Sequence, residues 1–290
     1  MQTNLLPEDL KEPIREFIEQ YCEERARESL PYSPSHPGTE AYFTPDKSQE
    51  DEYIEGHALP VPPAELWAGY GQDAHTYLDS GKLHVTNMIN TLESSDFFVD
   101  KAKRIMEFGC SAGRMIRHLP ELAPKAELWG VDISAQHIRW CIDHLTPTIH
   151  FATSTMHPHL PFEDRYFDLV FCGSVFTHIE DTAETWMLEL GRILRPGGRI
   201  YITLHDEHTV KLLDTELRDH YLAQSLLANS VYRENRGKFH MIVVGRRENS
   251  QVFYHSDYFR SILPPCFRVV SYTREAYGYQ SAAILEKVGA

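Results

Sequence analysis

Arg104-Ile-Met-Glu-Phe-Gly-Cys-Ser-Ala-Gly-Arg-Met-Ile-Arg-His-Leu119, followed by Leu128-Trp-Gly-Val-Asp-Ile-Ser134, is the stretch that decides the fold. It predicts an apolar strand that runs into a glycine turn, a helix after the turn, and a second apolar strand that ends in an acid. The acid is Asp132, which comes 19 residues after Gly113. That spacing places a carboxylate beside the ribose of a nucleoside lying across the first turn.

The glycine loop indicates which kind of nucleoside it suits. Its backbone must turn tightly and approach the ligand closely, which favours residues without a Cβ atom. The loop reads Gly109-Cys-Ser-Ala-Gly113 and not G-x-G-x-x-G. It therefore lacks the middle glycine that lets a pyrophosphate sit on a helix N-terminus. A nucleoside without phosphates fits this loop better than NAD does.

Two further blocks follow along the chain. They are Leu160-Pro-Phe-Glu-Asp-Arg-Tyr-Phe-Asp-Leu-Val-Phe-Cys-Gly-Ser-Val-Phe-Thr-His-Ile179 and Leu190-Gly-Arg-Ile-Leu-Arg-Pro-Gly-Gly-Arg-Ile-Tyr-Ile-Thr-Leu204. With the loop and the Asp132 strand they resemble the successive motifs of class I S-adenosylmethionine-dependent methyltransferases. The resemblance covers about residues 70–205 well and 251–287 moderately. It implies S-adenosylmethionine as the cofactor and S-adenosylhomocysteine as the product.

Strands and helices alternate from residue 104 onward. Such alternation predicts an α/β fold with a doubly wound, mostly parallel sheet that is covered on both faces. By the resemblance, two final strands at 267–271 and 281–287 pair antiparallel at the sheet edge, which gives seven strands. The other expected strands are 104–108, 126–131, 148–152, 167–172 and 199–204, and the expected helices are 112–119, 134–145 and 181–194.

The chain divides into two parts. Residues 1–100 are expected to form a helical N-terminal extension and cap, with one helix at 8–28 and another around Val85 to Leu92. Residues 101–290 are the expected methyltransferase domain. Within it, residues 206–255 form an inserted cap after the fifth strand, with a helix near 207–228 and a hairpin that pairs Phe239–Val244 with Gln251–Tyr254.

Composition narrows the function classes. A formal net charge of −14 and a pI near 5.6 argue against broad contact with a phosphate backbone, so we expect no nucleic-acid partner. The chain has no long apolar run, so we expect no membrane partner. Its five cysteines are scattered without a C-x-x-C pair and indicate reduced thiols in a cytoplasmic protein. The oligomeric state stays open.

The resemblance assigns the cofactor contacts residue by residue. It implies that the glycine loop lines the methionyl part, that Asp132 binds the ribose hydroxyls and that Ile133 packs on the adenine. Glu107 organises the loop and the methionyl amine, or is a structural carboxylate, and both roles can hold together. Many relatives have an acid after the third strand, which is missing here, so residues 153–156 must contact the adenine. The full expected set is Tyr77, Glu107, Gly109, Cys110, Ser111, Gly113, Asp132, Ile133, Thr153, Ser154, Thr155, Met156 and Ser174.

Two histidines are candidates for acid–base chemistry. His178 follows the fourth strand and His205 the fifth, so both lie at the rim where open α/β sheets bind ligands. His178 is a general base, a substrate contact, or a residue that caps the next helix and fixes its loop, and the last is favoured. For His205-Asp-Glu-His208 three interpretations compete: a general base with its orienting acid, a metal site, and solvated residues that open a helix. The base at His205 is favoured over the metal site, so we expect no metal.

The sequence favours a small-molecule acceptor. Aromatic residues before and after the core flank the two cap segments and suggest an enclosed site for a small, partly apolar or aromatic acceptor; they are Trp67, Tyr70, Tyr77, Tyr254, Tyr277 and Tyr279. We expect transfer to a hydroxyl oxygen by direct in-line displacement. The alternatives are N-methylation of a small amine, a non-catalytic binding module with the same fold, and an NAD-dependent enzyme on a related sheet.

Overall fold

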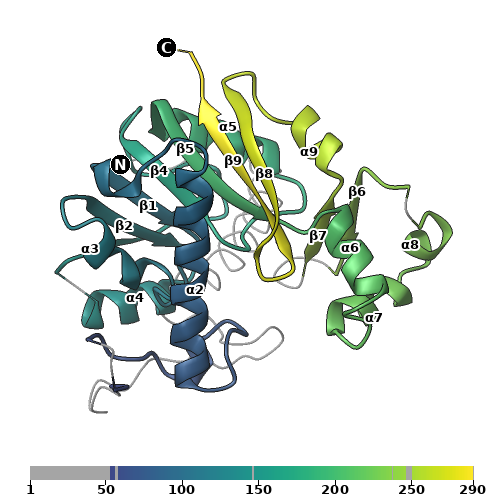
Figure 1. The fold of residues 1–290 in the computed structure, drawn as a ribbon, viewed down its shortest axis with the longest axis horizontal. Helices are drawn as coiled ribbons and strands as arrows, with labels where there is room; N and C mark the ends of the chain where they lie inside the picture. Colours follow the sequence, from purple (N-terminus) through teal and green to yellow (C-terminus); the bar gives the residue numbers. More distant parts are fainter. Residues whose placement is uncertain (1–52, 56–57, 146, 237, 246–249, 290) are drawn as a thin grey trace, which may run out of the picture.

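A seven-stranded sheet forms the centre of the computed structural model, with strand order β3-β2-β1-β4-β5-β9-β8 (Figure 1). The structure describes residues 53–55, 58–145, 147–236, 238–245 and 250–289. The helix expected at 8–28 lies outside these residues.

The sheet is mostly parallel, as predicted. The parallel strands are β1 (Arg104–Phe108), β2 (Glu127–Asp132), β3 (His150–Thr153), β4 (Phe167–Cys172) and β5 (Leu194–Leu204). Strand β9 (Gln280–Lys287) runs antiparallel between β5 and the edge strand β8 (Phe267–Tyr277). This arrangement confirms the doubly wound sheet and its antiparallel pairing at one edge.

Helices cover both faces of the sheet because side chains alternate along β1. Ile105 packs on one face with α2 (Ala74–Glu93), whose Val85, Met88 and Leu92 are buried there. Met106 packs on the other face with α5 (Ala183–Ile193). Helix α4 (Ala135–His144) contacts β2 and β3. The strand order reverses between β1 and β4, so the loops that leave these two strands diverge and open a crevice.

The helix predicted over 112–119 is wrong. After β1 the chain makes turns and forms only the 3-10 turn η3 (Ile116–His118) and the four-residue helix α3 (Leu119–Leu122). Ser111 and Gly113 have left-handed backbone angles, φ 48° and 72°, which an α-helix cannot contain. The Glu107 carboxylate accepts the N–H of Ile116, which a helix over 112–119 would have bonded internally.

The insert after β5 is broken into short helices, so the single helix predicted near 207–228 is also wrong. The helices are α6 (Glu207–Asp214), α7 (Tyr221–Ala228) and α8 (Ser230–Glu234). His220 and Asn229 cap α7 and α8 through side-chain acceptors, which fixes the breaks. The hairpin is confirmed, with β6 (Met241–Val244) paired to β7 (Gln251–Tyr254).

The insert has its own small apolar core beside the sheet, where Leu213, Leu222 and Phe253 are buried together. It forms a lobe on the β8 side of the sheet (Figure 1). The backbone N–H of Tyr254 donates to the carbonyl of His205 at 2.8 Å, which joins β7 to the carboxyl end of β5. None of the helices in the described ranges combines the length and the apolar character that a bilayer crossing needs.

Helix α2 approaches the loop after β1 so closely that only glycine fits at position 81. A Cβ atom there would lie 2.3 Å from the backbone oxygen of Arg114. Gly81→Ala gains about 1 kcal/mol of helix propensity. We expect overpacking strain of about 1–3 kcal/mol to outweigh that gain and to lower the free energy of unfolding.

Urea unfolding of Gly81→Ala measures this difference. Thr86→Ala, an exposed change in the same helix, is the control and should stay within about 0.5 kcal/mol of the wild type. A Gly81→Ala variant that is as stable as the control would contradict the close packing.

Candidate active site

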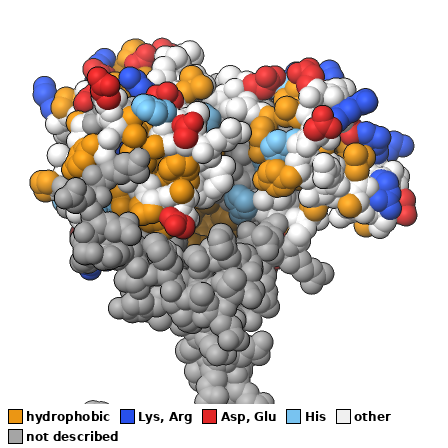
Figure 2. Space-filling model, turned by 90° about the horizontal axis from the view of Figure 1, so that it is seen from below, with side chains coloured by type: hydrophobic (Ala, Val, Ile, Leu, Met, Phe, Trp, Pro, Cys, Tyr) orange, Lys and Arg blue, Asp and Glu red, His pale blue; other side chains and the backbone are white. Residues whose placement is uncertain are grey.

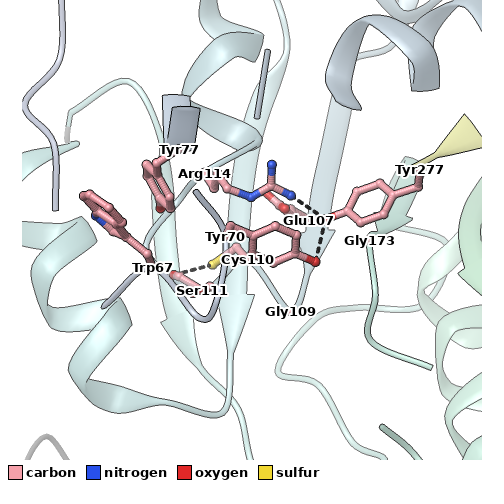
Figure 3. Close-up of a pocket in the computed structure, with 10 residues that line it drawn as sticks. All are labelled: Trp67, Tyr70, Tyr77, Glu107, Gly109, Cys110, Ser111, Arg114, Gly173 and Tyr277. Atoms are coloured by element: carbon pink, nitrogen blue, oxygen red, sulfur yellow. Dashed lines mark hydrogen bonds between the residues drawn. The ribbon is translucent and has the colours of Figure 1, made fainter. Parts of the chain in front are cut away.

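A pocket lies at the carboxyl ends of β1 and β4, where the strand order reverses (Figure 3). The loop after β1 forms one wall, Gly173 after β4 another, and aromatic side chains from before α2 and from the end of β8 close it. Its lining residues are Trp67, Tyr70, Tyr77, Glu107, Gly109, Cys110, Ser111, Arg114, Gly173 and Tyr277.

The loop after β1 has a backbone that glycine makes possible. Gly109 has φ 79°, and a Cβ atom there would lie 2.3 Å from the side chain of Val175. Gly113 has φ 72° and packs behind the loop against Leu145, away from the pocket lining. Of the four loop residues expected around the cofactor, Gly109, Cys110 and Ser111 line the pocket and Gly113 shapes the turn.

Asp132 holds the loop in place. One oxygen of its carboxylate accepts the backbone N–H of Ser111 at 2.7 Å, and the other accepts the N–H of Ser134 at 2.8 Å. A carboxylate has about four lone-pair sites, so roughly two are left for other donors. Asp132 is half-buried and lies at the carboxyl end of β2, so solvent or a ligand can reach its side chain. A structural role and a ligand-binding role are therefore compatible in this residue.

Glu107 is a buried acid at the floor of the pocket. Its carboxylate accepts the N–H of Ile116 at 2.9 Å. Burial raises the pKa of Glu107 to about 8, although the nearby Arg114 and the Ile116 N–H favour the charged form. Within the described residues it has no ion pair. A cationic group that entered the pocket would therefore stabilise its charged form.

Arg114 is a pocket residue that sequence reasoning missed. Its guanidinium donates to Ser80 Oγ, lies 3.1 Å from His84 Nδ1, donates to the Tyr277 hydroxyl, and stacks over the Tyr70 ring at 3.9 Å. The Tyr277 hydroxyl donates in turn to that of Tyr70 at 2.9 Å. Figure 3 shows the three side chains meeting. The available signal was an arginine directly after Gly113 and before the apolar pair Met115 and Ile116.

Tyr77 places an unpaired polar atom in the pocket wall. Its ring stacks on Trp67 at 5.3 Å, and only 1% of the residue is exposed. The hydroxyl of Tyr77 has no hydrogen-bond partner. Because buried polar groups in folded proteins almost always find a partner, this hydroxyl marks a position for a ligand atom.

The residues expected around the adenine lie at the ends of β2 and β3, which pair there as Asp132 with Thr153. Ile133 and Met156 are exposed apolar side chains, at 40% and 47%. The Ser154 N–H donates to the Asp132 carbonyl, and its buried hydroxyl has no partner. The hydroxyl of Thr155 accepts the backbone N–H of His157. The two strand ends therefore bring these residues to the same rim as Asp132.

Ser174 and His178 belong to the loop after β4, next to Gly173. Ser174 has φ 59°, and its hydroxyl accepts from Gln280 Nε2 at 2.8 Å. His178 Nδ1 lies 2.8 Å from the carbonyl of Ser250, which ties this loop to the start of β7. This contact supports the loop-fixing interpretation of His178.

His205 lies at the carboxyl end of β5 with 1% of its surface exposed. Neither ring nitrogen has a hydrogen-bond partner. Burial, reinforced by His178 and His220, lowers the pKa of His205 to about 3, so the ring is neutral. Its lone pair is free to accept a hydrogen bond.

Comparisons with known proteins agree with this geometry. Residues 106–202 match the family model described as a methyltransferase domain. The chain is 31% identical to a trans-aconitate 2-methyltransferase of Azoarcus sp. over 40% of this chain and 45% of that protein. It is 29% identical to a fatty-acid O-methyltransferase of Mycolicibacterium smegmatis over 36% of this chain and 37% of that one. The matches span between about a third and a half of these relatives.

Solved structures with the same fold include a Pyrococcus horikoshii protein, with a TM-score of 0.50 and 17% identity over 73% of this chain and 95% of that chain. Another is a magnesium protoporphyrin IX methyltransferase of Synechocystis, with a TM-score of 0.50 and 15% identity over 76% of this chain and 91% of that chain. At this identity the likeness concerns the fold alone.

The buried acid Glu107 predicts a pH dependence of stability. Its pKa is higher in the folded protein, about 8, than its ordinary value of 4.5, so the folded state holds the proton over that window. The free energy of unfolding therefore falls as the pH rises from 4.5 to about 8. Glu107→Gln removes this titration, and we expect its stability to fall less over the same range.

Urea unfolding at several pH values measures how steeply the free energy of unfolding falls with pH in the wild type and in Glu107→Gln. Glu127→Gln on β2 is the control, because hydrogen bonds from Tyr166 and Trp129 keep the pKa of Glu127 below 4.5 despite its partial desolvation. Equal slopes for Glu107→Gln and the wild type would show that Glu107 is not held protonated.

Proposed function

Because the chain belongs to the class I S-adenosylmethionine-dependent methyltransferase family, we propose that it transfers a methyl group from S-adenosylmethionine to a small-molecule acceptor and releases S-adenosylhomocysteine. One observation carries the proposal. Asp132 keeps about two lone-pair sites free beside a glycine loop that a nucleoside can approach.

The chain's own residues fit the parts of this cofactor. Asp132 accepts the ribose hydroxyls, and Ile133 and Met156 offer apolar surface to the adenine. Glu107 is the acid for the methionyl ammonium, whose charge favours the ionised carboxylate. The unpaired Tyr77 hydroxyl and the loop backbone at residues 109–111 receive the rest of the methionyl group. When bound, the cofactor supplies a methyl group activated by a sulfonium.

The protein's share in the reaction is to align the acceptor and exclude water. A hydroxyl oxygen is the favoured target, attacking the methyl carbon in line. Such an acceptor must lose its proton, and His205 at the end of β5 is the base candidate, a weak one while burial holds its pKa at about 3. The names of relatives that are O-methyltransferases favour oxygen over nitrogen.

Compartment and partners follow from composition. Cys110, Cys141, Cys172 and Cys266 are free thiols, which favours the reducing cytoplasm. The net charge of −14 disfavours a nucleic-acid partner, so the acceptor is a small molecule.

Asp132→Asn tests the cofactor assignment. We expect it to weaken S-adenosylhomocysteine binding by about tenfold, or ~1.4 kcal/mol, because a charge-assisted acceptor for the ribose is lost. Isothermal titration measures the affinity, with NAD as the parallel ligand, which should not bind.

The matched control is Asp168→Asn. Asp168 also accepts two backbone N–H groups, from Lys103 and Arg104, but at the opposite end of the strands. Asp168→Asn should lower the free energy of unfolding and leave the affinity for S-adenosylhomocysteine unchanged. Wild-type protein that binds NAD and not S-adenosylhomocysteine would overturn the proposed function.

Tyr77→Phe separates ligand binding from folding. Removing an unpaired buried hydroxyl should raise the stability of the free protein by about 1 kcal/mol. It should also weaken S-adenosylhomocysteine binding by a few-fold, because the ligand atom then loses the hydroxyl as a hydrogen-bond partner. Thermal unfolding and titration give the two values.

Tyr254→Phe is the control, for which we expect the opposite effect on stability. The hydroxyl of Tyr254 donates to the carbonyl of Ile179 at 3.0 Å, so its removal should lower stability and leave ligand affinity unchanged. If Tyr77→Phe bound S-adenosylhomocysteine as tightly as the wild type, Tyr77 would not contact the cofactor.

A further inference from the structure

Five aromatic rings form a continuous row where the insert meets the sheet. The contacts run from Phe253 to His205 at 4.8 Å, to Tyr279 at 5.7 Å, to His220 at 5.0 Å and to Tyr221 at 4.7 Å. We call these five residues the ring row. It joins β7, the end of β5, the turn between β8 and β9, and the start of α7.

The ring row borders the cofactor pocket. Tyr279 comes two residues after Tyr277, which lines that pocket. Gln280, next to Tyr279, binds the hydroxyl of Ser174, which follows the pocket residue Gly173. Figure 2 shows a hollow between the sheet and the insert, with histidine side chains on its walls. A molecule in that hollow would face the pocket from the insert side.

The ring row is electrically neutral. Burial lowers the pKa of both His205 and His220 and raises that of Tyr279, so none of these rings is charged near pH 7. The nearest buried acid, Asp206, is already used by the Thr209 N–H and the Tyr272 hydroxyl.

The nearest cation of the pocket, Arg114, is likewise engaged, by Ser80 and Tyr277. A carboxylate at the row would lose its water without gaining a partner charge from the described residues of the row or of the pocket, which is costly.

His205 is incompletely satisfied, and Tyr279 covers it. Both nitrogens of His205 are buried without hydrogen bonds, an arrangement that costs free energy. The Tyr279 ring lies nearly parallel to His205, with an interplanar angle of 26°, and is itself half-buried. The preceding Gly278 has φ 59°, and a Cβ atom there would meet nothing within 4 Å, so the turn is not packed on that side.

We propose that the ring row is the acceptor subsite, that it takes a neutral planar aromatic compound carrying a hydroxyl, and that Tyr279 occupies the place of that compound's ring until it arrives. On binding, the Tyr279 ring turns outward, and the acceptor ring takes its place with the hydroxyl edge tilted into the plane of the His205 ring, where the hydroxyl donates to a His205 nitrogen. This proposal rests on the proposed methyltransferase function and adds the chemistry of its acceptor.

Three naphthalene probes test the proposal on the full chain saturated with S-adenosylhomocysteine. 2-Naphthol has a hydroxyl, 2-methoxynaphthalene cannot donate a hydrogen bond, and 2-naphthoate is an anion. Isothermal titration should show 2-naphthol binding at least about tenfold more tightly than either of the others. Equal or tighter binding of 2-naphthoate would overturn the proposal.

Variants locate the effect. His205→Phe keeps a ring and removes the nitrogens, so it should reduce 2-naphthol to the affinity of 2-methoxynaphthalene. His240→Phe, an exposed histidine beside Tyr258 in the same insert, is the control and should change nothing. An unchanged preference for 2-naphthol in His205→Phe would overturn the assignment.

Tyr279→Ala gives a second test that does not depend on the folding of the His205 variant. It removes the ring that must move, so both uncharged probes should bind several-fold more tightly. Weaker or unchanged binding would show that Tyr279 does not occupy the acceptor position. Titration of each protein with S-adenosylhomocysteine alone separates failure of this proposal from failure of the proposed function. If the wild type does not bind S-adenosylhomocysteine, the proposed function itself is refuted.

Discussion

The bridge that the Asp132 carboxylate makes between the N–H groups of Ser111 and Ser134 is the constraint on which the site depends. Ser111 follows β1 and Ser134 follows β2, so one side chain ties the ends of two neighbouring strands together. It also holds Ser111 at φ 48°, a conformation that costs free energy in a residue with a Cβ atom. The same carboxylate therefore shapes the pocket wall and remains available to a ligand.

Much of the fold was predictable because its signals are local. The apolar runs of β1, β2, β4 and β5 fix a parallel sheet, and the glycine loop with Asp132 marks the crevice. The helix at 112–119 failed because Met115, Ile116 and Leu119 have helical spacing, while the backbone N–H groups of Ser111 and Ile116 bond to distant carboxylates. Periodicity reports which side chains are buried and cannot report where the backbone bonds.

The site was predictable only where sequence motifs reach it. Arg114 acquires its place from Ser80, Tyr70 and Tyr277, which come from a helix, a segment before it and the far end of the chain. These contacts join residues far apart in the sequence, so no spacing within a single sequence predicts them. The burial of His205 is similar, because β7 of the insert and the turn at Tyr279 cover it. The sequence can thus single out a residue such as His205, but tertiary contacts decide how buried that residue is.

Tyr279 packed on His205 also has a consequence for side reactions. The nitrogens of His205 are shut off from solvent, and the rings of Phe253 and Tyr279 pack against the imidazole. A sulfonium is an alkylating agent that water can destroy, and a dry neighbourhood slows that loss. A ring that leaves only in exchange for another ring would keep the methyl donor from wasteful hydrolysis between turnovers. The price is slower capture, because entry must wait for the turn at Gly278 to open.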